Sequence, residues 1–306
     1  MATHWIIPSD LDLSGKTAVV TGANTGLGFQ TIQTLAEHGA TTVLACRNLD
    51  KGENAKKKIL KAHPKAKVEV SEIDLTDLDS VRRFADRFKK NHGRLDFLVN
   101  NAGVMMPPFS ETKQGHELQW GVNHLGHFLL TSELWPVLSS TENARIVHLS
   151  SIAHKWGKAS DFANPIGKSN YDKQKAYGNS KLACLVFALE LQRRIEAGGL
   201  QMKSLGAHPG IADTELSRYL PGWMKVITPL FVFFVANSAE AGAQPSLRAA
   251  LDPSLDGGTF VGPSGFQEMK GLPVIVQPEA KATPKKAGID LWQASEKQIG
   301  ASFSVN

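Results

Sequence analysis

Short apolar runs alternate with longer amphipathic segments along the first two thirds of the chain. The runs have the length of buried strands, and the segments between them repeat their apolar positions at helical spacing. The pattern predicts strands over 17–21, 42–47, 67–73, 95–100, 144–150 and 200–207, and helices over 26–38, 50–62, 77–90, 113–138 and 172–197. This alternation predicts an α/β fold: a doubly wound, Rossmann-like parallel sheet with helices on both faces. Ligands of such sheets bind at the carboxyl ends of the strands.

Composition bears on the cellular compartment but does not decide the number of domains. With 306 residues, 42% of them hydrophobic, the chain can bury one large core or two small ones. Its two cysteines, Cys46 and Cys184, are too few for a disulfide framework, so we expect a cytoplasmic protein. The segment Met1 to Leu13 lacks the pattern of a signal peptide, and the longest apolar run, Leu230 to Ala236, is much shorter than the roughly 20 residues of a membrane span. We therefore expect no integral membrane segment.

The net charge of +5 does not point to a nucleic-acid partner, because the basic residues are scattered. The densest group, between Lys51 and Lys67, has the spacing of a solvated helix face. We expect no nucleic acid to bind.

The first predicted strand runs into a glycine-punctuated turn, and a helix follows at once. Gly22 permits a tight turn, Gly26 lets the backbone approach a pyrophosphate, and Gly28 lets the helix pack closely on the strand. The free N–H groups at the start of the helix suit an anion. Three glycines at these offsets are also compatible with an ordinary turn. The dinucleotide hypothesis predicts contacts along the whole turn, at Gly22, Asn24, Thr25, Gly26, Leu27 and Gly28.

The second strand ends in a basic residue at the place where the adenosine ribose of a dinucleotide lies in this kind of fold. An acidic residue there hydrogen-bonds the ribose hydroxyls of NAD, whereas an arginine accommodates the 2′-phosphate of NADP. The chain has Cys46 and Arg47, with no acid before Asp50. Arg47 could simply be a solvated strand end, but the absence of a competing carboxylate favours NADP(H).

The third and fourth strands end in further candidate contacts. Asp74, followed by Leu75, can accept a hydrogen bond from the adenine amino group; its alternative is to cap the next helix, where Thr76 or Asp77 is better placed. The fourth strand ends in amide and small residues that allow a ligand close to the backbone but also suit a plain turn. These are Asn100, Asn101, Ala102 and Gly103.

Asn123 interrupts the apolar pattern of the long predicted helix 113–138. A polar amide in mid-helix is unfavourable unless it finds partners, so a structural and a catalytic role are equally compatible with it. His124 and His127 have the i, i+3 spacing of a metal-binding pair, but no third ligand stands at a suitable spacing. We expect ordinary histidines on the helix surface and no metal site.

A serine pair and a tyrosine–lysine pair supply candidate acid–base chemistry. Ser150 and Ser151 fall where the fifth strand meets the ligand-binding edge. Tyr177 and Lys181 are four residues apart on a predicted helix, so they project from the same face. A neighbouring ammonium is expected to lower the pKa of the phenol and make it a usable base. The alternative is a buried tyrosine beside a lysine whose stem lies along it.

Together these residues resemble the short-chain dehydrogenase/reductase family. The resemblance covers about residues 16–265, in the family's order and at nearly its spacings, and leaves 266–306 as a C-terminal extension of a single domain. The family's motifs stand here at Thr21 to Gly28, Asp74, Asn100 to Gly103, Asn123, Ser151, Tyr177, Lys181 and His208-Pro209-Gly210 through Thr214. The interval of 26 positions between Ser151 and Tyr177 is similar to that of the branch containing retinol dehydrogenases, WW-domain oxidoreductase and light-dependent protochlorophyllide reductase.

The resemblance implies NADP(H)-dependent hydride transfer between nicotinamide and a carbonyl or alcohol carbon. It implies that Tyr177 passes a proton to or from the substrate oxygen, that Ser151 hydrogen-bonds this oxygen, and that Lys181 holds the nicotinamide ribose. Asn123 would anchor a water that links Lys181 to solvent. Pro209, Gly210 and Thr214 would bind the cofactor, with Thr214 holding the nicotinamide carboxamide.

The chain after Thr214 is strongly apolar, from Leu216 to Val235. In the family this segment covers the substrate, which implies a lipophilic carbonyl or alcohol. The same residues could instead pack on the sheet, form a homo-oligomer contact or associate with a membrane surface. Two other functions stay open: light-dependent C=C reduction as in protochlorophyllide reductase, and nucleotide sensing by a protein that has lost the chemistry.

Overall fold

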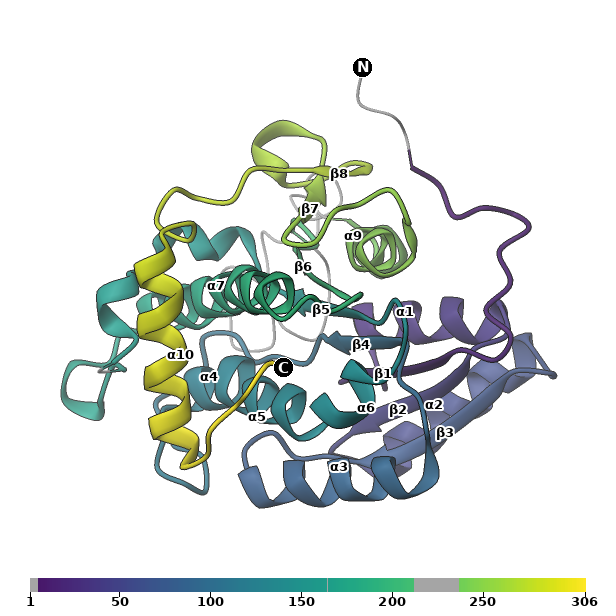
Figure 1. Cartoon of the computed structure of the whole chain (residues 1–306), viewed down its shortest axis with the longest axis horizontal. Helices are drawn as coiled ribbons and strands as arrows, with labels where there is room; N and C mark the ends of the chain where they lie inside the picture. The colour runs from purple at the N-terminus through teal and green to yellow at the C-terminus, as the bar shows by residue number, and fades with distance from the viewer. Residues whose placement is uncertain (1–4, 164, 212–236) are drawn as a thin grey trace, which may run out of the picture.

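The computed structural model describes residues 5–163, 165–211 and 237–306, and its centre is an eight-stranded sheet (Figure 1). The strands follow the order β3-β2-β1-β4-β5-β6-β7-β8. All neighbouring strands are parallel except β7 and β8, which pair antiparallel. The bounds are β1 Thr17–Thr21, β2 Thr41–Cys46, β3 Lys67–Glu72, β4 Phe97–Asn100, β5 Arg145–Leu149, β6 Lys203–Ala207, β7 Phe260–Pro263 and β8 Pro273–Ile275. The predicted doubly wound fold is confirmed.

Helices cover both faces of the sheet. One face carries α1 (Gly26–Glu37), α2 (Leu49–Ala62) and α9 (Ala239–Leu251). The other carries α3 (Leu78–Asn91), α5 (Gly126–Glu133) and α7 (Lys173–Ala197), with α10 (Lys285–Ile299) lying across α7 (Figure 1). Successive strand side chains point to opposite faces, so Val19 joins the core under α3, α5 and α7 whereas Val20 joins the core under α1 and α9.

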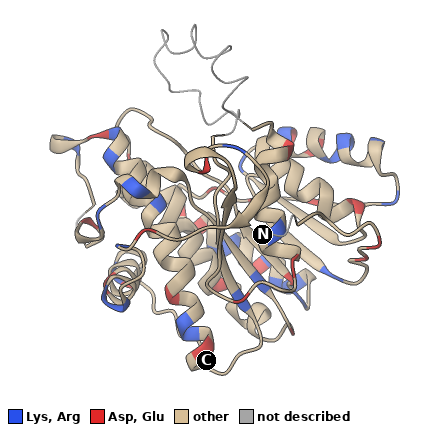
Figure 2. Ribbon diagram, turned by 90° about the horizontal axis from the view of Figure 1, so that it is seen from above, with Lys and Arg blue, Asp and Glu red and all other residues tan. Residues whose placement is uncertain are grey.

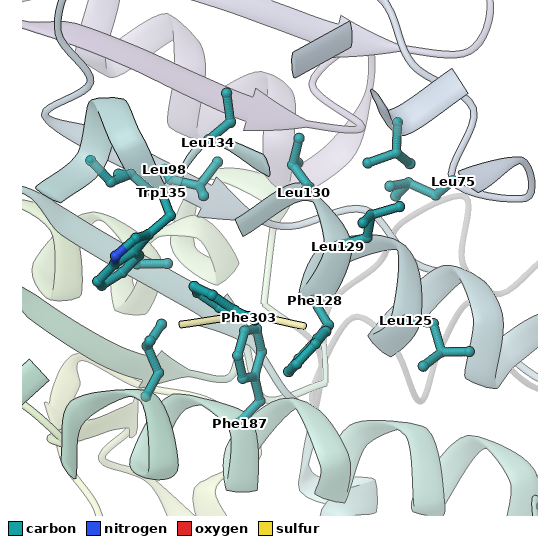
Figure 3. Close-up of a cluster of buried hydrophobic side chains, with 14 of the residues drawn as sticks. Leu75, Leu98, Leu125, Phe128, Leu129, Leu130, Leu134, Trp135, Phe187 and Phe303 are labelled. Carbon is teal, nitrogen blue, oxygen red and sulfur yellow. The ribbon is translucent and has the colours of Figure 1, made fainter. Parts of the chain in front are cut away.

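The C-terminal extension belongs to the main core. Figure 3 shows Phe303 among side chains from α5 and α7. Its ring centroid lies 5.6 Å from that of Phe128 and 5.3 Å from that of Trp135, both in edge-on arrangements. Trp292 on α10 is also buried and lies edge-on to Phe128, with the centroids 5.1 Å apart. Aromatic burial of this kind makes residues beyond 265 part of the same folding unit.

The long helix predicted over 113–138 is wrong in its bounds and continuity. The chain forms α4 (Leu118–Trp120), a π-helical turn (Gly121–Leu125), α5, and then α6 (Trp135–Ser139). Residues 111–117 form a turn instead, closed by a bridge between Glu111 and Glu117. The break before α6 fits Pro136, which lacks the N–H that a continuous helix needs.

No helix in residues 5–163, 165–211 and 237–306 is long and apolar enough to cross a membrane. Figure 2 shows Lys and Arg interspersed with Asp and Glu over the outer helices. Several Lys and Arg side chains form ion pairs with an Asp or Glu on the same helix. On α10, for example, Lys286 lies 2.8 Å from Asp290. This mixed surface agrees with the expectation of solvated helix faces.

Candidate active site

The turns that follow β1 and β4 are tied together by Thr21. The buried Thr21 Oγ1 accepts hydrogen bonds from the backbone N–H groups of Asn101 and Ala102, each at 3.0 Å. Asn101 Nδ2 in turn donates to the Thr21 carbonyl oxygen at 2.7 Å. The two turns, both predicted to bind a dinucleotide, are therefore joined to each other. Ala102 lies beside Gly22, and Gly103 lies beside Asn123.

The glycines of the first turn are required by its geometry. Gly22 and Gly26 have φ values of 66° and 58°, which side-chain-bearing residues rarely adopt. A Cβ on Gly28 would lie 2.5 Å from Asn101 Nδ2 and 2.7 Å from the Gly22 oxygen. The sequence-based interpretation of this turn is therefore consistent with its conformation.

The start of α1 fits the pyrophosphate of a dinucleotide. Its N-cap, Thr25, makes no side-chain cap, and the first turn has no acidic residue. By contrast, Asn48, Asp77, Asp172 and Ser238 cap α2, α3, α7 and α9 through their side chains. The first N–H groups of α1 thus lack the side-chain acceptor that α2, α3, α7 and α9 carry, and Asn24, Thr25 and Leu27 beside them are half-buried.

At the end of β2 the chain offers a cation and a neutral thiol. Arg47 is exposed directly after the strand. Cys46 is buried, and burial raises the pKa of its thiol to about 11. Asn48 turns the chain into α2 by accepting from the Lys51 N–H at 2.8 Å.

Asp74 lies after β3, and it does not cap α3. Its Oδ1 accepts from the backbone N–H and the hydroxyl of Thr76, whereas Asp77 caps the helix by accepting from the Asp79 N–H. Leu75 is buried against Gly126. Asp77 is thus the capping residue, as the sequence favoured, and Asp74 lies half-buried at the strand end.

Asn123 lies in the π-helical turn, and its side-chain amide is hydrogen-bonded to Val104 and Ser180. Its Oδ1 accepts from the Val104 N–H at 2.8 Å, and its Nδ2 donates to the Val104 oxygen and to Ser180 Oγ. These contacts hold the segment after Gly103 against α7. The expectation that His124 and His127 lie on the helix surface is wrong: both are almost fully buried, at 1% and 3% exposure.

The hydrogen-bond partners of His124 and His127 come from distant parts of the sequence. The helical pattern alone therefore could not show that these histidines are buried. His124 Nε2 lies 2.7 Å from Ser295 Oγ on α10, and His127 Nε2 lies 2.9 Å from Thr21 Oγ1. Within the part of the chain that the structure describes, no three His, Cys, Asp or Glu side chains gather as a metal site would require.

Tyr177 and Lys181 lie side by side on α7, both buried. Lys181 Nζ is 6.0 Å from the centre of the Tyr177 ring and donates to the Leu149 oxygen at 2.9 Å. Ser151 follows β5, and its hydroxyl lies beside the Tyr177 phenol, where it acts to lower the phenol pKa. The structure thus brings together Asn123, Ser151, Tyr177 and Lys181 beside the strand ends.

The expectation that a neighbouring ammonium gives Tyr177 a low pKa is wrong. Burial raises the pKa of the phenol to about 12, more than the neighbouring Ser151 hydroxyl lowers it. Burial also lowers the pKa of the Lys181 ammonium. The sequence indicated a positive charge next to the phenol, but it could not show that both groups are buried. Burial removes water from both groups and so disfavours their charged forms.

The loop that carries Ser151 is held against α7 by residues to which the sequence analysis assigned no role. His154 donates a hydrogen bond from Nδ1 to the backbone carbonyl oxygen of Ser151 at 2.6 Å. Asn179 accepts from the Lys158 N–H at 2.8 Å. Gly157 and Gly178 let the two backbones touch, directly after Tyr177. The signal in the sequence was the glycine next to Tyr177, a costly residue inside a helix unless close packing needs it.

We expect Gly178→Ala to separate Ser151 from Tyr177. The added Cβ would lie 3.0 Å from the Gly157 nitrogen and 3.1 Å from the Ala153 oxygen, both backbone atoms that must move. Overpacking of this kind costs roughly 1–3 kcal/mol. The expected result is a lower Tm together with a lower kcat. Gly198→Ala, at the end of the same helix, is the matched control, because its Cβ would come no closer than 3.4 Å to its neighbours. An unchanged kcat in Gly178→Ala would contradict the account.

The segment after β6 is held by the β7–β8 hairpin. The Pro209 oxygen accepts from Asn237 Nδ2 at 3.0 Å, and Gly210 has a φ of 71° with its backbone against Met269. His208 Nε2 lies 2.8 Å from a Glu268 carboxylate oxygen of the hairpin. Pro209 and Gly210 therefore have a defined place after the end of β6, whereas Thr214 and the apolar segment 216–235 lie outside the described residues.

The sequence agrees with this architecture. Residues 16–225 match the profile of the family described as short chain dehydrogenase, so the chain belongs to that family of oxidoreductases, whose cofactor is a nicotinamide dinucleotide. Among curated relatives it is similar to mouse retinol dehydrogenase 11, with 43% identity over 84% of this chain and 79% of the relative. It is also similar to mouse retinol dehydrogenase 12, with 39% identity over 97% and 90% of the two chains.

A solved structure has the same fold over nearly the whole chain. An uncharacterized protein from Mycobacterium paratuberculosis is 37% identical, with a TM-score of 0.79 over 98% of this chain and 99% of its own. The predicted family and its retinol-dehydrogenase-like branch are thereby confirmed.

Proposed function

We propose that the protein is an NADP(H)-dependent oxidoreductase that interconverts a lipophilic carbonyl compound and its alcohol. The observation that carries this proposal is the juxtaposition of Tyr177, Lys181 and Ser151 beside the turn after β4, where Gly103 lies against Lys181 and the adjacent Ala102 lies against Gly22 of the turn after β1. When bound, the dinucleotide supplies or accepts a hydride at its nicotinamide ring. The protein's part is to bind, orient and move a proton.

Each side chain has a definite part in this proposal. Tyr177 donates its phenolic proton to the substrate oxygen during reduction and takes it back during oxidation. Ser151 donates a hydrogen bond to the same oxygen, so that charge developing there is stabilised. Lys181 holds the nicotinamide ribose and keeps a positive charge near the phenol, and Asn123 anchors the water that connects Lys181 with solvent. Gly22, Asn24, Thr25, Gly26, Leu27, Gly28, Asp74, Leu75, Asn101, Ala102, Gly103, Pro209, Gly210 and Thr214 line the cofactor.

A screen of NADPH oxidation against aldehydes and ketones of increasing lipophilicity tests the proposal. The expected result is turnover with at least one class of lipophilic carbonyl, retinal among the candidates because the similar curated proteins are named retinol dehydrogenases. NADPH binding without turnover across such a panel would favour a nucleotide-sensing protein instead. A purified protein that absorbs as a tetrapyrrole complex would favour the protochlorophyllide alternative. We also propose a cytoplasmic location, on the ground of the two free cysteines.

Arg47→Asp is expected to weaken NADPH binding by at least about tenfold and to narrow the gap to NADH. The reason is that a charge-assisted contact to the 2′-phosphate contributes roughly 1.5–3 kcal/mol. Lys57→Asp makes the same charge change at an exposed position of α2 and serves as the control. Fluorescence titration with both dinucleotides measures the effect. Equal wild-type affinities for NADPH and NADH would refute the proposed preference.

The lipophilic substrate predicts a dependence on chain length. If each buried methylene contributes about 0.8 kcal/mol, kcat/KM for straight-chain aldehydes should rise roughly threefold to fourfold per carbon until the pocket is full. The measurement is a series from about four to twelve carbons with NADPH. A flat or falling profile, or a preference for short polyols, would leave the apolar segment 216–235 with a purely structural role.

A further inference from the structure

His127 lies between Thr21, at the turn after β1, and Asn123, and it has no part in the proposed reaction. Its ring is buried on the first turn of α5. One ring nitrogen, Nε2, is 2.9 Å from Thr21 Oγ1, and the other, Nδ1, is 3.0 Å from the Asn123 backbone oxygen. The two partners are far apart in the sequence but belong to the two halves of the candidate site.

The neighbours of Thr21 decide which nitrogen of His127 carries the proton. Thr21 Oγ1 already accepts two N–H groups, from Asn101 and Ala102, so its own hydroxyl hydrogen must be donated. The nearer acceptor is His127 Nε2 at 2.9 Å, because the Val99 oxygen is 3.4 Å away. Nε2 is therefore unprotonated.

The Asn123 side leads to the same conclusion. A carbonyl oxygen only accepts, so a nitrogen 3.0 Å from it must donate. His127 therefore carries its proton on Nδ1. Burial, with a smaller contribution from the Lys181 ammonium, lowers the pKa of His127 to about 4, so the ring is neutral at pH 7. Cys184 Sγ donates to the same carbonyl at 3.2 Å, and the oxygen is thus held from two sides.

We propose that His127 is a positioning residue, which in its neutral Nδ1–H form fixes the Asn123 carbonyl relative to Thr21 and the dinucleotide turn. The inference rests on the proposed function, in which Asn123 serves the proton path and the turns tied by Thr21 hold the cofactor. His127 touches neither substrate nor cofactor. It keeps the two parts of the site in one register through a short, buried hydrogen-bonded path: Asn101 and Ala102 N–H to Thr21, Thr21 to His127, and His127 to Asn123.

Two variants separate the two ends of this path. In His127→Asn the short amide can keep the donor to the Asn123 carbonyl but does not reach Thr21. In His127→Gln the longer amide can accept from Thr21 but leaves the Asn123 carbonyl without this donor. We expect His127→Asn to raise the Kd for NADPH about threefold to tenfold with kcat nearly unchanged, and His127→Gln to lower kcat by a similar factor with Kd nearly unchanged, as for loss of one neutral hydrogen bond.

Phe128→Leu is the matched control, because it perturbs the adjacent buried side chain of α5 without touching the path. It should lower the Tm. Any change in kcat should be matched by a proportional change in NADPH affinity. If both histidine variants lose affinity and kcat in the same proportion as this control, or if neither constant changes, the positioning role is contradicted and His127 only fills the core.

The wild-type protein gives a test that needs no variant to fold and no turnover. In the full chain labelled with ¹⁵N-histidine, His127 should show a protonated Nδ1 and an unprotonated Nε2. A protonated Nε2 would overturn the proposal. If no carbonyl compound is reduced, the proposed function fails, whereas the tautomer and the NADPH affinity of His127→Asn still test the positioning role on their own.

Discussion

Replacing Tyr177 by phenylalanine is expected to lower kcat for NADPH-dependent carbonyl reduction by a factor of about 10²–10⁴, the usual contribution of a well-placed general acid. The ring remains, so the packing of α7 is kept, and only the proton donor beside Ser151 is lost. NADPH affinity should change little, because the hydroxyl serves the proton transfer more than cofactor binding.

Tyr171→Phe makes the same change at a half-buried tyrosine six positions earlier. Its hydroxyl donates to the Pro107 oxygen at 2.9 Å and accepts from Gln119 Nε2 at 3.0 Å. We expect this control to lose some stability and to keep most of its activity. Steady-state rates and fluorescence titration of NADPH measure both variants. A Tyr177→Phe enzyme with about half the wild-type rate would remove Tyr177 from the proposed mechanism.

The second large effect is expected in the pH dependence of the two reaction directions. Reduction uses the protonated phenol, whereas alcohol oxidation uses the phenolate. Burial raises the pKa of Tyr177 to about 12, so the phenol is protonated throughout the neutral range. Below its pKa the phenolate fraction grows tenfold per pH unit. Oxidation should therefore accelerate about 100-fold between pH 7 and pH 9, while reduction stays nearly constant.

The measurement is kcat/KM in both directions over this range, with saturating cofactor. Tyr177→Phe is the control, because its residual rate should lack the tenfold slope. An oxidation rate that reaches a plateau below about pH 8 would show that the proton-transfer group has a pKa near neutrality in the working enzyme. That result would contradict the assignment of the high pKa to the catalytic state.

Most of the sheet could be predicted from the sequence, because strands such as β1, β4 and β5 are buried along their whole length and read as apolar runs, whereas the last two strands, β7 and β8, were not predicted. The first strand was predicted at its observed bounds, 17–21, whereas the sixth, predicted from residue 200, begins at Lys203. The glycine turn and the Tyr177–Lys181 pair were also recognisable, because local backbone geometry and helix periodicity determine where they point.

Features that depend on distant contacts could not be predicted in this way. The π-helical turn at Asn123 is held by Val104 and Ser180, and the buried histidines find their partners at Thr21 and Ser295. The pKa of Tyr177 depends on how deeply α7 is buried, which a charge four residues away does not reveal. The roles of the site residues in binding and catalysis stay predictions from their geometry and their resemblance to the family.

Deuterium transfer tests the central claim most directly. NADPH carrying deuterium at both C4 positions is incubated with the protein and a long-chain aldehyde or retinal, and the alcohol product is analysed by mass spectrometry. The account predicts one deuterium on the carbinol carbon of the product made by the wild-type protein, and no product above background with Tyr177→Phe. An alcohol product without deuterium, or equal labelled product from both proteins, would contradict hydride transfer at this site.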